Sequence, residues 1–215
     1  MQYTPEIAWN DDDSNYGLSA SGGGTSIYVS RPIWQTGVPG IPSGSYRLAP
    51  DVALYSSPNN PEYLYCTSDT SAWLSVPQQA SCNSGFRDSA TGYLTVAGGT
   101  GFAAPIFAGM VAILNQKLDF TTGLGLANST LYALALNSSD YASAFHDVTS
   151  GNNDCLAGGT YCSGTSGYST GAGYDEVTGL GSVDLANLAA VWPANSGRSD
   201  PLIGARVPGI PGSPG

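Results

Sequence analysis

Basic side chains are scarce in this sequence. Its 215 residues include 6 Lys and Arg against 16 Asp and Glu, so the formal net charge is -10 and the pI is near 4.1. A surface of this sign repels nucleic acid and anionic lipid, and neither a nucleic acid nor a membrane is expected as a partner. The charge suits an acidic or extracellular setting, although an ordinary soluble protein with an acidic bias fits the composition equally well.

Long apolar runs are also missing. No stretch of about 18 apolar residues occurs, and the start does not have the pattern of a signal peptide. Hydrophobic residues still make up 41% of the chain, which is enough for a sizeable core. With 29 Gly and 13 Tyr, the composition is typical of a loop-rich secreted protein. We therefore expect that Met1 is not the native start, or that the true N-terminus lies upstream.

Cysteine is limited to 4 residues, which allow alternative pairings. The local pairing, Cys66 with Cys82 and Cys155 with Cys162, closes short loops inside segments rich in Gly, Ser and Thr. Disulfides indicate an oxidising, extracellular compartment. The alternative is free or metal-binding thiols, although no Cys-x-x-Cys spacing supports a zinc site.

Two Asn-x-Ser/Thr triplets, 128–130 and 137–139, are acceptor signals for N-glycosylation. Such triplets often arise by chance, so they are only a weak indication of secretion.

The segment YLTVAGGTGFAAPIFAGMVAILNQ, residues 93–116, joins a predicted strand, a glycine turn and a predicted helix. The apolar run Tyr93–Ala97 predicts the strand. Residues from about Phe102 to Lys117 predict a helix that is apolar nearly all round and therefore buried in the core. Pro105 fits only in the first helical turn, which fixes the helix start close to Gly101. A helix N-terminus favours a developing anion, so Gly101 stands where a nucleophile would be useful.

Other elements follow from the apolar pattern. Leu48–Tyr55 predicts a buried strand, and helices are expected at about Asn128–Leu136 and Leu185–Val191. The carboxylate of Asp51 inside the strand needs a partner, and Arg47 is the local candidate.

The end of the chain has no core-forming pattern after Pro193. We expect residues 1–195 to form one unit, and residues 196–215 to be a linker or a tail added to the natural sequence.

The run from Gly99 to Pro105, after a strand and before a buried helix, resembles the nucleophile segment of subtilisin-like serine peptidases, in which Ser follows Gly-Thr. The sedolisin (serine-carboxyl peptidase) branch fits better than a subtilisin with a histidine base, because the only histidine is His146, in a loop beside Asp147. Several blocks resemble sedolisins in the family's order: Ser21–Gly24 with Ser26, Pro32 and Gln35; Arg47 with Pro50–Val52; Gly98–Pro105 and Gly109; Phe145–Val148; Gly173–Asp175; and Thr178–Gly181.

The resemblance implies an α/β fold of the subtilisin type, a three-layer arrangement in which helices cover both faces of a parallel sheet. It spans about residues 6–190 and implies the C-terminal half to three-fifths of the catalytic domain. It also implies a secreted endopeptidase that cleaves peptide or protein substrates in acid through a Ser/Glu/Asp triad. A Glu base still works at low pH, where histidine is protonated.

The catalytic residues of the family are missing from this chain. Gly101 stands at the position of the nucleophilic Ser, while Gly99 and Thr100 remain as the scaffold of the oxyanion side. The family's Glu and Asp lie one turn apart on a helix, and no glutamate here has an Asp at the fourth following position. We expect an inactive chain whose partner is the missing N-terminal half of the domain. The alternative is a calcium-stabilised pseudopeptidase or a secreted binding module.

A calcium (Ca²⁺) site is the second property that the resemblance implies. Ca²⁺ takes about six to eight oxygen ligands, often carboxylates and main-chain carbonyls of loops. The family's ligands map onto two carboxylates and three carbonyls, those of Asp147, Asp175, Val148, Gly171 and Gly173. From the residues alone, Asp in such Gly- and Thr-rich loops is more often a turn former. His146 is expected as a hydrogen-bonding neighbour and not as a ligand.

Overall fold

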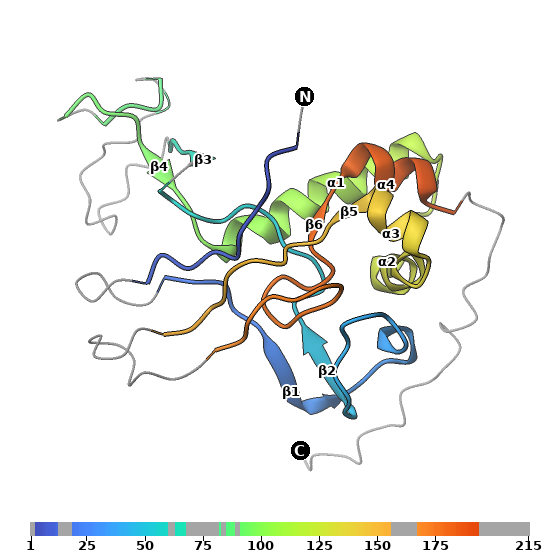
Figure 1. Ribbon diagram of the computed structural model, residues 1–215. Helices are drawn as coiled ribbons and strands as arrows, with labels where there is room; N and C mark the ends of the chain where they lie inside the picture. The colour runs from blue at the N-terminus through green and yellow to red at the C-terminus, as the bar shows by residue number, and fades with distance from the viewer. Residues whose placement is uncertain are drawn as a thin grey trace, which may run out of the picture.

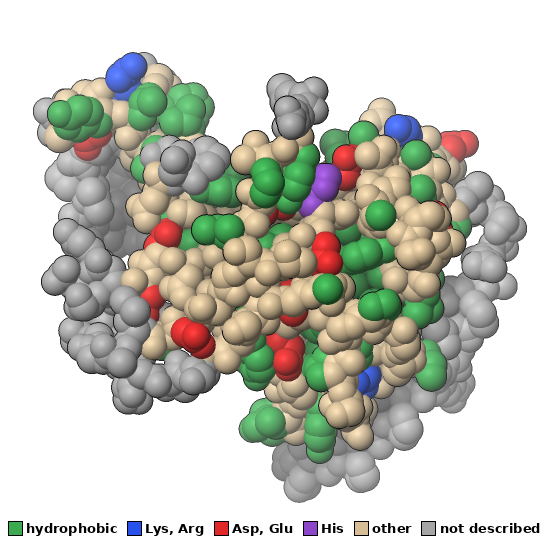
Figure 2. All heavy atoms as spheres, viewed as in Figure 1, with side chains coloured by type: hydrophobic (Ala, Val, Ile, Leu, Met, Phe, Trp, Pro, Cys, Tyr) green, Lys and Arg blue, Asp and Glu red, His purple; other side chains and the backbone are tan. Residues whose placement is uncertain are grey.

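The computed structural model describes residues 3–12, 19–59, 63–67, 82, 85–88, 91–155 and 167–193. Its strands and helices are β1 (Gly24–Ser30), β2 (Tyr46–Ala49), β3 (Tyr63–Leu64), β4 (Val96–Ala97), α1 (Ala103–Lys117), α2 (Ala127–Ala135), α3 (Ser138–Ala144), β5 (Phe145–His146), β6 (Ser182–Val183) and α4 (Leu185–Val191). In Figure 1, α2, α3 and α4 gather on one side of the fold, and the β1–β2 pair lies below α1. In the same view, acidic side chains are spread over the visible face and basic side chains are few (Figure 2). None of the described helices combines the length and the hydrophobicity needed to cross a bilayer. The predicted tail lies outside the described residues.

Regular strand pairing is short and antiparallel: β1 pairs with β2, β3 with β4 and β5 with β6. The predicted sheet requires parallel strands. Within the described ranges, parallel pairing is limited to a single bridge between Ala53 and Ser182. The Ala53 N–H donates to the Gly181 carbonyl beside this bridge at 3.0 Å. Parallel strands are stable inside a sheet that is covered on both faces. The described strands do not extend the bridge into a continuous parallel sheet.

Two predicted strands are shorter in the structure. The prediction of a strand at Leu48–Tyr55 is wrong beyond Ala49, where β2 ends. Pro50 follows, and proline has no N–H to donate to a ladder. Of the apolar run that precedes the glycine turn, only Val96–Ala97 forms a regular strand, β4.

The three expected helices are confirmed as α1, α2 and α4, but the sequence pattern misses α3. Asn137 is the N-cap of α3, and its side-chain oxygen accepts from the N–H groups of Ser139 and Asp140 at 3.0 and 3.4 Å. An Asn cap followed by an acid in the first turn is a helix-start signal. The short segment SSDYASA has too weak an apolar stripe to be recognised by periodicity.

The prediction that α1 is a core helix is wrong for one of its faces. Leu114 is fully buried and Phe107 packs against the core, while Ile113 is 50% exposed. The exposed face is made of small or apolar side chains, among them Ala104, Pro105, Ala108, Gly109 and Ala112. Exposed apolar surface of this kind is unfavourable in water. None of the described elements covers this face.

A buried glutamine connects β2 to α2 inside the core. The Gln35 side chain is fully buried, and its amide group donates to the Leu48 carbonyl at 2.9 Å and to the Tyr132 hydroxyl at 2.7 Å. Its carbonyl accepts from the Leu48 N–H at 2.8 Å. Satisfied buried networks of this kind specify one arrangement of the core. Gln35 thus ties β2 to α2.

Candidate functional site

The glycine turn before α1 has the geometry that the sequence predicts. A 3-10 turn at Thr100–Phe102 leads directly into α1, and the Phe102 N–H donates to the Gly99 carbonyl at 3.1 Å. The N–H groups of Thr100 and Gly101 precede this first bonded N–H in the chain. Like the first donors of any helix, they have no acceptor within the helix itself. An anion beside Gly101 therefore lies at the positive end of the helix dipole.

The three glycines of the turn differ in what their backbone requires. Gly99 has φ 113°, which side-chain-bearing residues rarely adopt. A Cβ on Gly98 would lie 2.5 Å from the Pro58 nitrogen and 2.6 Å from the Ser56 carbonyl oxygen. A Cβ on Gly101 meets no atom within 4 Å, and Gly101 does not have a positive φ. A serine side chain therefore fits at position 101 without a shift of the backbone.

The glycine turn gives a stability prediction. Gly98→Ala is expected to lower the free energy of unfolding by about 2–3 kcal/mol, because the added methyl group overlaps main-chain atoms. Gly101→Ala is the matched control, and is expected to leave stability unchanged or to raise it by up to about 1 kcal/mol. Urea unfolding of both variants measures the difference. Equal losses at the two positions would contradict this geometry of the turn.

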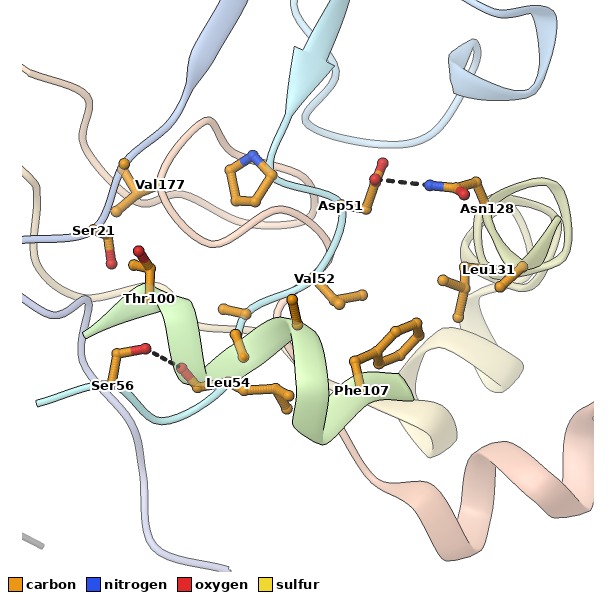
Figure 3. A pocket seen from close by; sticks show the side chains of 16 residues that line it. Ser21, Asp51, Val52, Leu54, Ser56, Thr100, Phe107, Asn128, Leu131 and Val177 are labelled. Carbon is orange, nitrogen blue, oxygen red and sulfur yellow. Dashed lines mark hydrogen bonds between the residues drawn. The ribbon is translucent and has the colours of Figure 1, made fainter. Parts of the chain in front are cut away.

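A pocket of about 470 Å³ opens beside Thr100. Its walls come from the start of α1, residues 50–54, the glycine-rich segment at Ser21, and α2. Figure 3 shows Ser21 and Thr100 at one end of the pocket, and Asp51 and Asn128 at the other. Apolar walls with a few polar groups are the usual composition of a ligand pocket.

Asp51 is the only acidic residue among the described pocket-lining residues, and the recorded partners of its carboxylate are all side chains. Arg47 Nη2 lies 2.6 and 2.5 Å from its two oxygens, Asn128 donates at 2.7 Å and the Tyr132 hydroxyl at 2.9 Å. Arg47 also lies 5.0 Å above the Trp34 ring. Burial, and then the charge of Asp51, raise the pKa of the Tyr132 hydroxyl, so it remains a donor. Asp51 is therefore a structural anion and not a free base.

The Arg47–Asp51 pair confirms the local partner predicted from the sequence. The contacts from Asn128 and Tyr132 were missed, because they lie 77 and 81 residues further along the chain. No local pattern signals such a contact.

The glutamates do not complete a catalytic group in the described part of the chain. Glu6 accepts hydrogen bonds from the hydroxyls of Tyr3 and Ser182, and Glu176 accepts from Thr25 at 2.7 Å. Neither lines the pocket beside Thr100. Glu62 lies outside the described residues.

The structure brings the predicted calcium residues together. Asp147 accepts from the Gly173 N–H at 2.8 Å, and Asp175 accepts from the Gly171 N–H at 3.1 Å. The second oxygen of Asp147 is buried and has no hydrogen-bond partner among the described residues. In the same part of the chain, no recorded hydrogen bond reaches the carbonyls of Val148, Gly171 or Gly173. Carboxylate and carbonyl oxygens without partners are the donor set that a hard cation needs.

Asp175 also acts as a turn former, the role that its loop composition favours. Its Oδ1 accepts from the N–H groups of Val177 and Thr178 at 2.9 and 2.8 Å. The described residues contain no group of three or more His, Cys, Asp or Glu side chains that could hold a metal. A cation at this loop would therefore depend on main-chain carbonyls and water as well as the two carboxylates.

Two neighbours of the loop are aromatic. Burial, and then the charge of Asp147, raise the pKa of the Tyr141 hydroxyl, which keeps this phenol neutral beside the carboxylate. His146 stacks on the Tyr3 ring with 3.8 Å between the ring centroids.

The predicted disulfide between Cys66 and Cys82 is confirmed. Cys155 is also disulfide-bonded. Its predicted partner, Cys162, lies outside the described residues.

Comparison with known proteins finds relatives over most of the chain. Sedolisin of Pseudomonas sp. (strain 101) is 34% identical over 194 residues, which are 90% of this chain and 26% of sedolisin. Kumamolisin of Bacillus sp. (strain MN-32) is 33% identical over 89% of this chain and 28% of kumamolisin. No protein-family profile matches the chain.

A solved structure has the same fold. Pseudomonas sedolisin, described as a serine-carboxyl proteinase in complex with two molecules of pseudo-iodotyrostatin, matches with a TM-score of 0.61 and 34% identity. The match covers 87% of this chain and 41% of the sedolisin chain. The subtilisin-like α/β fold class is thus confirmed, and the chain spans about a quarter of the length of the curated relatives it matches. By sequence and by fold, the chain belongs to the sedolisin family.

Proposed function

We propose that this chain is part of a secreted, acid-acting endopeptidase domain of the sedolisin type, and that on its own it does not hydrolyse peptide bonds. One observation supports this most strongly. Gly101 lies at the N-terminus of α1, beside a pocket, at a position where nothing in the backbone requires glycine. The similarity to sedolisin and kumamolisin supports a peptide or protein as the substrate of the whole domain.

Peptide hydrolysis by this type of site requires three groups: a nucleophile, a base that accepts its proton, and donors that stabilise the oxyanion. The N-terminal N–H groups of α1 are suited to the third role. The nucleophile is absent, because Gly101 has no side chain. The described pocket wall offers no base, because Asp51 is already bonded to Arg47, Asn128 and Tyr132.

The variant Gly101→Ser tests this division of roles. It restores a hydroxyl but no base, so we expect no azocasein hydrolysis above the buffer blank at about pH 4. Adding the upstream half of the domain as a second polypeptide is expected to give turnover with the Ser variant and none with the unchanged chain. Turnover by the Ser variant alone would mean that a base lies within this chain, and would refute the proposal.

We also propose that Asp147 and Asp175, with the carbonyls of Val148, Gly171 and Gly173, bind a structural Ca²⁺ ion. The unpartnered buried oxygen of Asp147 and the unused carbonyls support this ligand set. A bound ion would supply positive charge where Asp147 meets Gly173, which lies 26 residues further along the chain. Its expected role is to stabilise the fold, not to take part in chemistry at position 101.

A further inference from the structure

The two Asn-x-Ser/Thr triplets lie at opposite ends of α2 and differ in the state of their amide nitrogens. Asn128 is in the first turn of α2, is partly buried and lines the pocket. Its Nδ2 donates to Asp51 at 2.7 Å. A sugar on this nitrogen would have to fit between α2 and the pocket wall. Its hydrogen bond to Asp51 and its place on the pocket wall make this nitrogen less accessible than that of an exposed asparagine.

Asn137 is exposed at the corner between α2 and α3, with φ -101° and ψ 116°. Its Oδ1 accepts from the Ser139 N–H at 3.0 Å and from the Ser139 hydroxyl at 2.8 Å, besides capping α3 through Asp140. Within the described residues, no recorded bond involves its Nδ2. The carbonyl of this amide is therefore committed, while the nitrogen, which is the atom that glycosylation modifies, is free and faces water.

From this difference, we propose that Asn137 is an acceptor site for an N-linked glycan and that Asn128 is not. The co-reactant is an oligosaccharide linked to a lipid through a diphosphate. A bond forms between Nδ2 of Asn137 and C1 of the first N-acetylglucosamine, while the bond from C1 to the diphosphate oxygen breaks. The lipid diphosphate leaves, and Nδ2 loses one proton. The amide carbonyl keeps its bonds to the first turn of α3.

The site does not interfere with the rest of the molecule. Asn137 and Asn128 are separated by the length of α2, about 14 Å at the helical rise per residue. The glycan would cover the exposed corner at Leu136, which is 56% exposed, and not the pocket. The disulfides at Cys66–Cys82 and Cys155 fit passage through an oxidising compartment that also holds the sugar donor.

Secretion of the chain from yeast tests the proposal. The glycans are cleaved from its peptides with an amidase in heavy-oxygen water, which converts each glycosylated Asn to a labelled Asp. We expect label at position 137, none at 128, and loss of the gel-mobility shift in Ser139→Ala. Thr130→Ala removes the other triplet and is expected to keep the shift.

Folding is controlled separately. Asn137→Asp removes the acceptor nitrogen and keeps a capping oxygen, so a folded, unshifted Asp variant separates loss of the glycan from loss of the helix cap. Folded secreted protein with Asn137 unlabelled, or with label at Asn128, would overturn the proposal. Neither readout depends on peptidase activity or calcium.

Discussion

Removal of calcium is expected to lower the melting temperature of this chain by about 5–10 °C. An ion present at about 100 times its dissociation constant stabilises the folded state by about 2.7 kcal/mol. In a domain of this size, about 1 kcal/mol corresponds to about 2–4 °C. The measurement is thermal unfolding with excess calcium and with excess chelator, at fixed protein concentration and ionic strength.

Two Asp→Asn variants control for the loss of negative charge. Asp147→Asn removes a ligand charge with little change of shape, and its melting temperature is expected to be the same with and without calcium. Asp119→Asn is the matched control, because Asp119 is exposed and has φ 55°, a conformation that Asn tolerates. It should keep the full calcium response. If the melting temperature of the unchanged chain did not shift and metal analysis found no calcium, the proposed site would be refuted.

Asp51→Ala is expected to lower the free energy of unfolding by about 3 kcal/mol, because it leaves the Arg47 guanidinium without its anion. The Arg47 and Asp51 side chains are only 20% and 23% exposed, so water replaces the lost contact poorly. The donors on Asn128 and Tyr132 lose an acceptor as well. The midpoint of urea unfolding measures the change.

The control for Asp51 is an exposed hydrogen bond between side chains. Thr25 donates to Glu176 at 2.7 Å on the surface, and Thr25→Val is expected to cost no more than about 0.5 kcal/mol. The double variant Arg47→Met with Asp51→Leu should lose less stability than Asp51→Ala alone, because no charge is left unpaired. If Asp51→Ala lost no more than Thr25→Val, the pair would not stabilise the fold.

Local chemistry made much of the site predictable. Proline at position 105 and the glycines before it set the start of α1 within two residues, because proline fits only in the first turn. Arg47 and Asp51 are four residues apart, so their pairing was visible in the sequence. The disulfide between Cys66 and Cys82 is the one that their short separation in the sequence predicts.

Other features depend on contacts that no local pattern encodes. The apolar sequence of α1 predicts burial, but burial depends on what packs against each face, and the described elements cover only part of the helix. The bonds from Asn128 and Tyr132 to Asp51 connect parts of the chain far apart in sequence. The approach of Asp147 to Gly173 was expected only through resemblance to a family, because spacing alone does not show which loops meet.

Peptide hydrolysis by the unchanged chain is the most direct test of the proposed role of position 101. Purified chain is incubated with azocasein at about pH 4, where a carboxylate base is still ionised, in excess calcium. The expected result is no release of acid-soluble dye above the blank, because the nucleophile position has no side chain. Turnover that is proportional to the concentration of the chain and depends on calcium would contradict the proposal.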